Sequence, residues 1–99
     1  MTKAYAISII RELSMDERSW ANDYMSWRGK KQMAAQRCYE QWALEELISH
    51  IRKSRKPPID AAEEFCKKMD SYACSGDIMF SIAYDAGLYA LDMLLTAEE

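Results

Sequence analysis

The segment WANDYMSWRGKKQMAAQRCYEQW, residues 20–42, holds three tryptophans and two tyrosines of this 99-residue chain. A capping box, Ser14 with Glu17, stands just before it and indicates a helix start. At 100° per residue, most of the segment's large side chains lie within about 60° of one another on a helix. These side chains, the aromatic stripe, are Trp20, Tyr24, Trp27, Cys38 and Trp42. The stripe predicts a helical core, but it indicates no particular activity.

Gly29 raises the question whether residues 15–54 form one helix or two. A single helix of about 40 residues would be about 60 Å long, roughly twice the diameter of a small domain. That length favours a break at Arg28-Gly29-Lys30. The aromatic stripe nevertheless keeps its register across Gly29, as a continuous helix would. We expect a kink or a break, and an unbroken helix would indicate a dimer.

A first, shorter helix is expected over residues 3–13, ending at Ser14, with Ile7, Ile10 and Leu13 turned inward. In the long segment, the apolar set changes face after Trp42. The new set is Leu44, Leu47, Ile48 and Ile51. Residues 42–48 are therefore apolar on two sides, which places them at the centre of the fold.

Two more helices are expected after Pro57-Pro58. Proline suits the first helical position, so the third helix opens at Pro58, and Ser75-Gly76 ends it. The last helix spans residues 77–96 and contains Gly87, which indicates close helix packing. The expected core positions are Ile59, Ala62, Phe65, Cys66, Met69 and Tyr72, then Met79, Ile82, Ala83, Ala86, Ala90, Met93 and Leu94.

Composition and charge limit the possible functions. Apolar residues make up 49% of the chain, with seven Met and eleven aromatics, enough for a core and for some partner contact. Residues 1–56 carry 11 Lys and Arg against 7 Asp and Glu, whereas residues 57–99 carry 2 against 9. The net charges of +4 and −7 give the two parts opposite signs, so they can pair within the fold, pair between subunits or present different faces.

The sequence predicts a cytoplasmic protein. It has no uninterrupted apolar run of 18 residues and no signal-peptide pattern, so we expect neither a membrane span nor secretion. Cys38, Cys66 and Cys74 are odd in number and lie in apolar contexts, so we expect reduced, buried thiols.

Patterns typical of enzymes and metal sites are missing. The three Cys and His50 match the ligand count of a zinc site, but no two of them have the short spacing such a site needs. Glu46 precedes His50 by four residues, not by the three typical of helical metal oxidases. Glycine-rich phosphate loops and the paired acidic helices of nucleotide pyrophosphatases are also missing. We expect no catalytic residue, no metal and no cofactor.

Two sets of residues are candidate binding sites. Trp20, Tyr24, Trp27 and Arg28 have the composition of a protein interface, although plain core packing would also place aromatic residues there. The second set is basic and would suit phosphate contacts, although the run at 52–56 equally suits a helix C-terminus. Its members are Lys30, Lys31, Arg37, Arg52, Lys53, Arg55 and Lys56.

Acidic residues form a third pattern in the last helix. Asp77, Asp85 and Asp92 recur at intervals of eight and seven residues and so share one side. They would form a carboxylate ridge for a basic partner, or simply the wet face of an amphipathic helix.

Two short segments, RCYEQWALEELI at residues 37–48 and FSIAYD at residues 80–85, carry a resemblance. Both resemble short uncharacterised helical proteins of Firmicutes genomes, their phages and mobile elements. The resemblance implies a bacterial cytoplasmic protein and, by analogy only, an inhibitor or adaptor role. It carries over no functional residue.

Taken together, the sequence predicts an all-α, compact helical bundle of four main helices, or five if the long segment breaks at Gly29. Residues 1–99 would form a single domain. The expected function is non-enzymatic binding of another protein, and nucleic-acid binding through the basic set is the alternative. A homodimer is expected, because a small chain has difficulty covering so many large apolar side chains alone.

Overall fold

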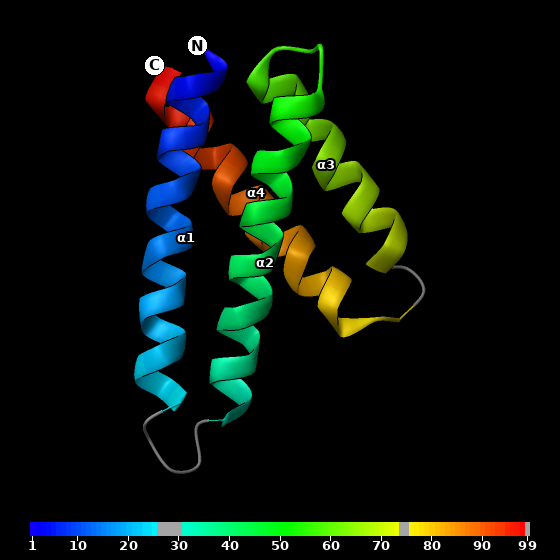
Figure 1. Cartoon of the computed structure of the whole chain (residues 1–99). Coiled ribbons are helices and arrows are strands. Elements are labelled where there is room, and N and C mark those ends of the chain that lie inside the picture. The colour runs from blue at the N-terminus through cyan, green and yellow to red at the C-terminus, as the bar shows by residue number, and fades with distance from the viewer. Residues whose placement is uncertain (26–30, 74–75, 99) are drawn as a thin grey trace.

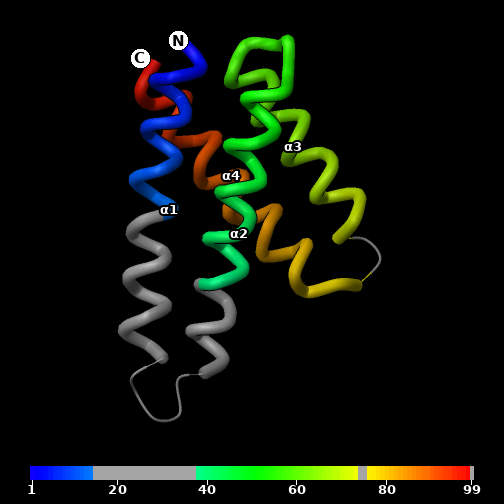
Figure 2. Tube along the Cα trace, in the orientation of Figure 1, coloured from blue at the N-terminus to red at the C-terminus, as the bar shows by residue number. Residues whose placement is uncertain are grey.

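The computed structural model describes the backbone of residues 1–25, 31–73 and 76–98, and the side chains of residues 1–14, 38–73 and 76–98. It shows the expected all-α fold (Figure 1). Its helices are α1 (Lys3–Met25), α2 (Lys31–Lys53), α3 (Pro58–Ala73) and α4 (Ile78–Glu98). Figure 2 traces the same path and shows in grey the residues whose side chains are not described.

The first two helices form an antiparallel pair, with α1 and α2 in extensive contact along their length (Figure 1). Residues 15–54 are therefore not one continuous helix, and the expectation of a break is confirmed. Its position at Arg28-Gly29-Lys30 lies outside the described residues. The inference that an unbroken helix would indicate a dimer no longer applies.

The predicted helix end at Ser14 is wrong, because α1 continues through Ser14 to Met25. Ser14 is a buried polar residue, one and two turns beyond Ile10 and Ala6, which are also buried. It extends the inward face of α1, so tertiary packing prevails over the local capping pattern. Because the first expected helix is continuous with the start of the second, the described residues form four helices, not five, despite the break.

The start of α3 follows the proline prediction. Pro58 is its first residue, and the N–H of Ala61 donates to the carbonyl of Pro57 at 2.9 Å. At the other end of the chain, the amino group of Met1 lies 3.3 Å from Glu98 Oε1. This ion pair joins the two ends of the chain, which lie side by side in Figure 1.

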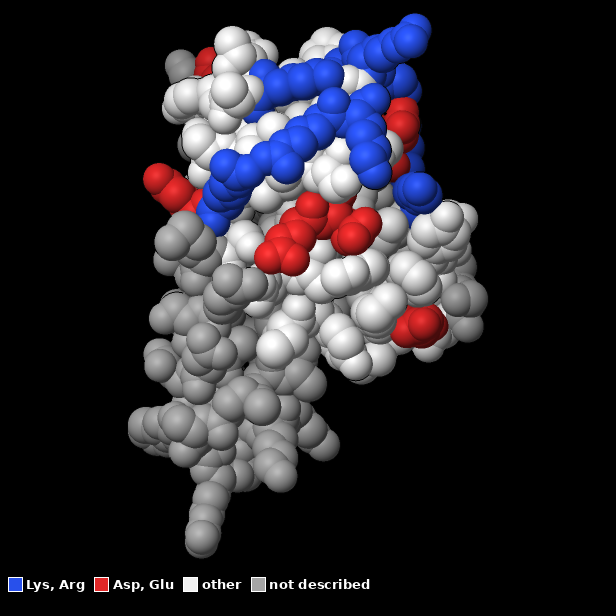
Figure 3. Space-filling view, in the orientation of Figure 1, with Lys and Arg blue, Asp and Glu red and all other residues white. Residues whose placement is uncertain are grey.

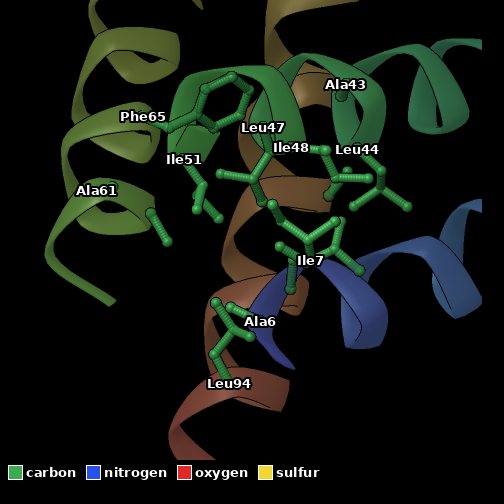
Figure 4. Close-up of a cluster of buried hydrophobic side chains, with 14 of the residues drawn as sticks. Ala6, Ile7, Ala43, Leu44, Leu47, Ile48, Ile51, Ala61, Phe65 and Leu94 are labelled. Atoms are coloured by element: carbon green, nitrogen blue, oxygen red, sulfur yellow. The ribbon is translucent and has the colours of Figure 1, made fainter. Parts of the chain in front are cut away.

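The core lies where all four helices meet (Figure 4). Its central element is α2, which contacts the other three helices and buries residues on two adjacent sides, as the change of face after Trp42 predicted. Trp42 itself is partly buried against this cluster. The large side chains that are fully enclosed are Ile10, Leu47, Ile51 and Leu94.

Helix α4 crosses the other helices at an angle and contacts each of them (Figure 1). Its Gly87 allows a close approach to α3, as predicted. A Cβ at this position would lie 3.1 Å from Cys66 Sγ and 3.3 Å from Phe65 Cδ1. A Cβ would fit there only if the side chains of Cys66 and Phe65 shifted by a few tenths of an ångström.

Some predicted core positions are less enclosed than expected. Tyr72 is exposed, although its ring packs against Phe80 with centroids 5.0 Å apart, so its placement in the core is wrong. The residues that are only partly buried are Leu13, Ile59, Met79, Ile82 and Met93. Three of these five belong to α4. This helix therefore exposes more apolar surface than its predicted core positions implied.

Replacing Gly87 with Val tests the close approach. We expect Gly87→Val to lower the free energy of unfolding by about 1–3 kcal/mol, because the new side chain overpacks against Phe65 and Cys66. Urea denaturation followed by circular dichroism measures the loss. Ser81→Val, at an exposed position of the same helix, is the matched control for helix propensity. Equal effects of the two substitutions would contradict the packing at Gly87.

Candidate interaction surface on helix α4

The buried face of α4 consists mainly of small residues. Its buried positions are Ala83, Ala86, Gly87, Ala90 and Leu94. Four of these five are Ala or Gly. Because their side chains are small, the backbone of α4 can approach the neighbouring helices closely. The backbone N–H of Met79 donates to Asp77 Oδ1 at 2.9 Å and fixes the start of the helix.

The outward face of α4 carries larger apolar side chains than the buried one. Ile78 is 70% exposed, Tyr89 56%, Leu95 43% and Leu88 42%. Leu91 is partly buried and lies on α4 between Leu88 and Leu95. Leu88, Leu91 and Leu95 are spaced by three and four residues, so they form a continuous stripe along the helix.

Two exposed carboxylates border that stripe. Asp85 and Asp92 are seven residues apart, which places them on one side of the helix about 10.5 Å from each other. The side chain of Asp77 instead accepts the hydrogen bond from the Met79 N–H that caps the helix. Of the three acids predicted to form a ridge, only Asp85 and Asp92 therefore lie beside the stripe. The α4 face is defined here as the stripe, the two carboxylates along its border, and Ile78 and Tyr89 on the far side of these carboxylates.

The sequence predicted the acids of this face but gave no role to its exposed apolar residues. A signal for them was present, because α4 is apolar around most of its circumference. A helix of that kind must be covered on every side or lie against something else. Here the other helices cover one side of α4 and leave Ile78, Leu88, Tyr89 and Leu95 exposed.

Helix α4 is also long and apolar enough to cross a membrane, with a mean hydropathy of 1.4 over 18 residues. A core helix meets the same criterion, and here Leu94 and the small residues of α4 lie in the core. Asp85 and Asp92 interrupt this segment, so it is not an uninterrupted apolar run. The expectation of no membrane contact stays a prediction.

The predicted aromatic interface cannot be placed. The side chains of Trp20 and Tyr24, and the whole of Trp27 and Arg28, lie outside the described residues. Within the described part, Tyr39 is exposed at 38% and Trp42 packs on the core.

The basic run at the end of α2 is exposed. Figure 3 shows Lys and Arg side chains gathered over one end of the molecule, and Arg52, Lys53, Arg55 and Lys56 are all exposed. Lys30 and the side chains of Lys31 and Arg37 lie outside the described residues.

Glu64 of α3 neutralises part of this run. The Lys56 amine donates a hydrogen bond to Glu64, and His50 Nε2 lies 3.2 Å from Glu64 Oε1. The hydrogen bond from Lys56, and then its charge, hold the pKa of the Glu64 carboxyl below its usual value. The same contacts raise the pKa of the Lys56 amine. Lys56 is therefore less free to bind an external anion than Arg52, Lys53 and Arg55.

Replacing Lys56 tests the assignment of the lowered pKa. In Lys56→Gln we expect the pKa of Glu64 to rise toward its ordinary value, because its largest stabilising contact is gone. Carboxyl carbon NMR titration measures this shift, and Lys67→Gln is the control that should leave it unchanged. A folded-state pKa that is lowered favours folding above the unfolded pKa, and this contribution is lost as pH falls through the lowered value. An unchanged Glu64 titration in Lys56→Gln would contradict the assignment.

His50 and the cysteines do not form a metal site in the described part of the chain, where no group of three His, Cys, Asp or Glu side chains gathers. Cys66 is buried, and burial raises the pKa of its thiol to about 11, with a smaller contribution from Glu63. Cys38 is exposed, so its predicted burial is wrong, and Cys74 lies outside the described residues.

A hollow of about 220 Å³ lies between α2 and α3. Its lining comprises Glu46, Ser49, His50, Lys53, Phe65, Lys68 and Met69. Small-molecule sites typically measure about 300–1,000 Å³. The hollow is smaller than that, so it is a weaker candidate site than the α4 face.

Comparisons with known proteins identify no relative: no family model matches the chain, and neither a curated protein nor a solved structure matches it significantly. The resemblance to helical proteins of Firmicutes and their phages therefore stays a prediction.

Proposed function

We propose that this protein acts by binding another protein through the α4 face. The observation that carries the proposal is the distribution of side-chain size on α4. Four of its five buried residues are Ala or Gly, while Ile78, Leu88, Tyr89 and Leu95 are exposed.

Folding alone would favour the opposite arrangement. Burying a Leu or Ile side chain stabilises a protein by about 1.5–3 kcal/mol, whereas a single methyl group contributes about 0.8 kcal/mol. Leu88 and Leu95 leave 42% and 43% of their surface exposed, so they make only part of this contribution in the isolated chain. A partner that covers them would recover it, and patches of this kind mark interaction sites.

Site-specific photo-cross-linking in the producing cells tests this proposal. A photoreactive phenylalanine analogue placed at position 89 or 95 should form adducts with another protein, because both positions lie on the α4 face. The same analogue at Glu12 or Glu63, which are exposed on α1 and α3, is the control and should form none. Leu88→Ser should reduce the adducts at position 89 severalfold.

The mass of the adduct distinguishes the possible occupants. A product at twice the chain mass of 11.5 kDa would identify a second copy. A lipid adduct at position 95 would identify a membrane. Either result, or adducts of equal yield at the control positions, would contradict binding of a different protein through this face.

Nucleic-acid binding is the second candidate, supported by the exposure of the basic run. Arg52, Lys53 and Arg55 have no ion pair with a residue that the structure describes. Replacing all of Arg52, Lys53, Arg55 and Lys56 with Gln should abolish salt-dependent retention on DNA-cellulose, because phosphate contacts release counterions. Retention that survived the fourfold substitution would contradict a role for this run.

A further inference from the structure

The charge of the α4 face limits what can cover it. Residues 69–99 contain six acidic residues and no Lys or Arg. Asp85 and Asp92 border the apolar stripe with no ion pair to any described residue, and Glu98 is already paired with the amino group of Met1. The apolar stripe of the α4 face is therefore bordered on one side by two negative charges.

We infer that the α4 face binds a basic amphipathic helix of a partner protein. This inference rests on the proposed function and specifies the chemistry of the partner. The apolar side of the partner helix covers Leu88, Leu91 and Leu95. Its Lys or Arg side chains, spaced by seven residues, meet Asp85 and Asp92.

The heptad spacing of the face supports a helix as the occupant. Tyr84, Leu88, Leu91 and Leu95 follow intervals of four, three and four, the pattern of a helix–helix seam, and all four retain exposed surface. Relative to this seam, Asp85 and Asp92 occupy the flanking position at which charge selects the partner. Two cations on a partner helix, seven residues apart, match their separation of about 10.5 Å.

The same charges disfavour a second copy at this face. Two α4 helices packed antiparallel through this seam would place the Asp85 and Asp92 rows against each other. Like charges brought together across an interface oppose binding. An anionic membrane surface is disfavoured for the same reason.

Selection from a phage-displayed library of 18-residue amphipathic helices tests the inference on the full chain. The library varies the residues that flank the apolar side among Lys, Arg, Gln and Glu. Enriched sequences should carry Lys or Arg at two positions seven residues apart. Enrichment of neutral or acidic sequences would overturn the inference.

The selected peptide then serves as the probe for matched variants. Asp85→Asn with Asp92→Asn should weaken its binding about tenfold at low ionic strength and reduce the dependence of binding on salt. Glu12→Gln with Glu63→Gln removes the same charge from exposed sites on α1 and α3 and should leave binding within about twofold. Equal binding by the Asp85/Asp92 variant and the wild type would contradict the role of the two carboxylates.

Leu88→Ser separates the inference from the proposed function. If peptide binding is lost in Leu88→Ser but insensitive to the two Asn substitutions, the face binds protein without selecting for charge, and only the inference fails. If binding survives Leu88→Ser, the peptide occupies another surface, and the proposed function fails as well. Circular dichroism of each variant confirms that the exposed substitutions leave the fold intact.

Discussion

The close packing of α4 against α3 at Gly87 is the constraint on which the rest of the structure depends. Cys66 and Phe65 come so near to Gly87 that a Cβ there would lie only 3.1 Å and 3.3 Å from their atoms. This proximity fixes which side of α4 is buried. That side carries mostly Ala, so α4 packs at a short distance from its neighbours. The larger side chains of Leu88 and Tyr89 lie on the opposite side and are exposed. The interaction surface is thus a direct consequence of how the core is packed.

Charge is distributed over the fold in a way that gives the molecule two distinct surfaces. Lys and Arg gather at the C-terminal end of α2, where Glu64 neutralises only Lys56 (Figure 3). The α4 face contains Asp85 and Asp92 and no cation. Lys56 with Glu64, and the amino group of Met1 with Glu98, pair the two charged parts within the fold, but Arg52, Arg55, Asp85 and Asp92 form no ion pair with a described residue. Each surface can select its own partner by sign.

Much of the fold was predictable from the sequence, because apolar spacing and proline positions act locally. The start of α3 at Pro58, the change of face after Trp42 and the close approach at Gly87 all follow from such signals. The helix end predicted at Ser14 failed for a physical reason. A capping pattern competes with helix continuation, and the burial of Ser14 beside Ile10 decides between them only in the folded chain.

The site was less predictable than the fold. The spacing of Asp85 and Asp92 revealed the acids of the α4 face, and the periodicity of the last helix correctly predicted the burial of Ala83, Ala86, Ala90 and Leu94. The periodicity did not show that Leu88, Tyr89 and Leu95 stay exposed, because a helix that is apolar around most of its circumference can be covered on more than one side. Their exposure depends on how the other three helices pack against α4 in the folded chain.

Hydroxyl-radical footprinting of the isolated protein, read by tandem mass spectrometry, tests the orientation of α4 most directly. Leu94 and Leu95 are adjacent and chemically identical, but Leu94 is fully buried whereas Leu95 is 43% exposed. We predict rapid oxidation of Leu95, Leu88 and Tyr89 and protection of Leu94, at both low and high protein concentration. Equal protection of Leu94 and Leu95 in the isolated chain would contradict the account, because it would mean that the α4 face is already covered.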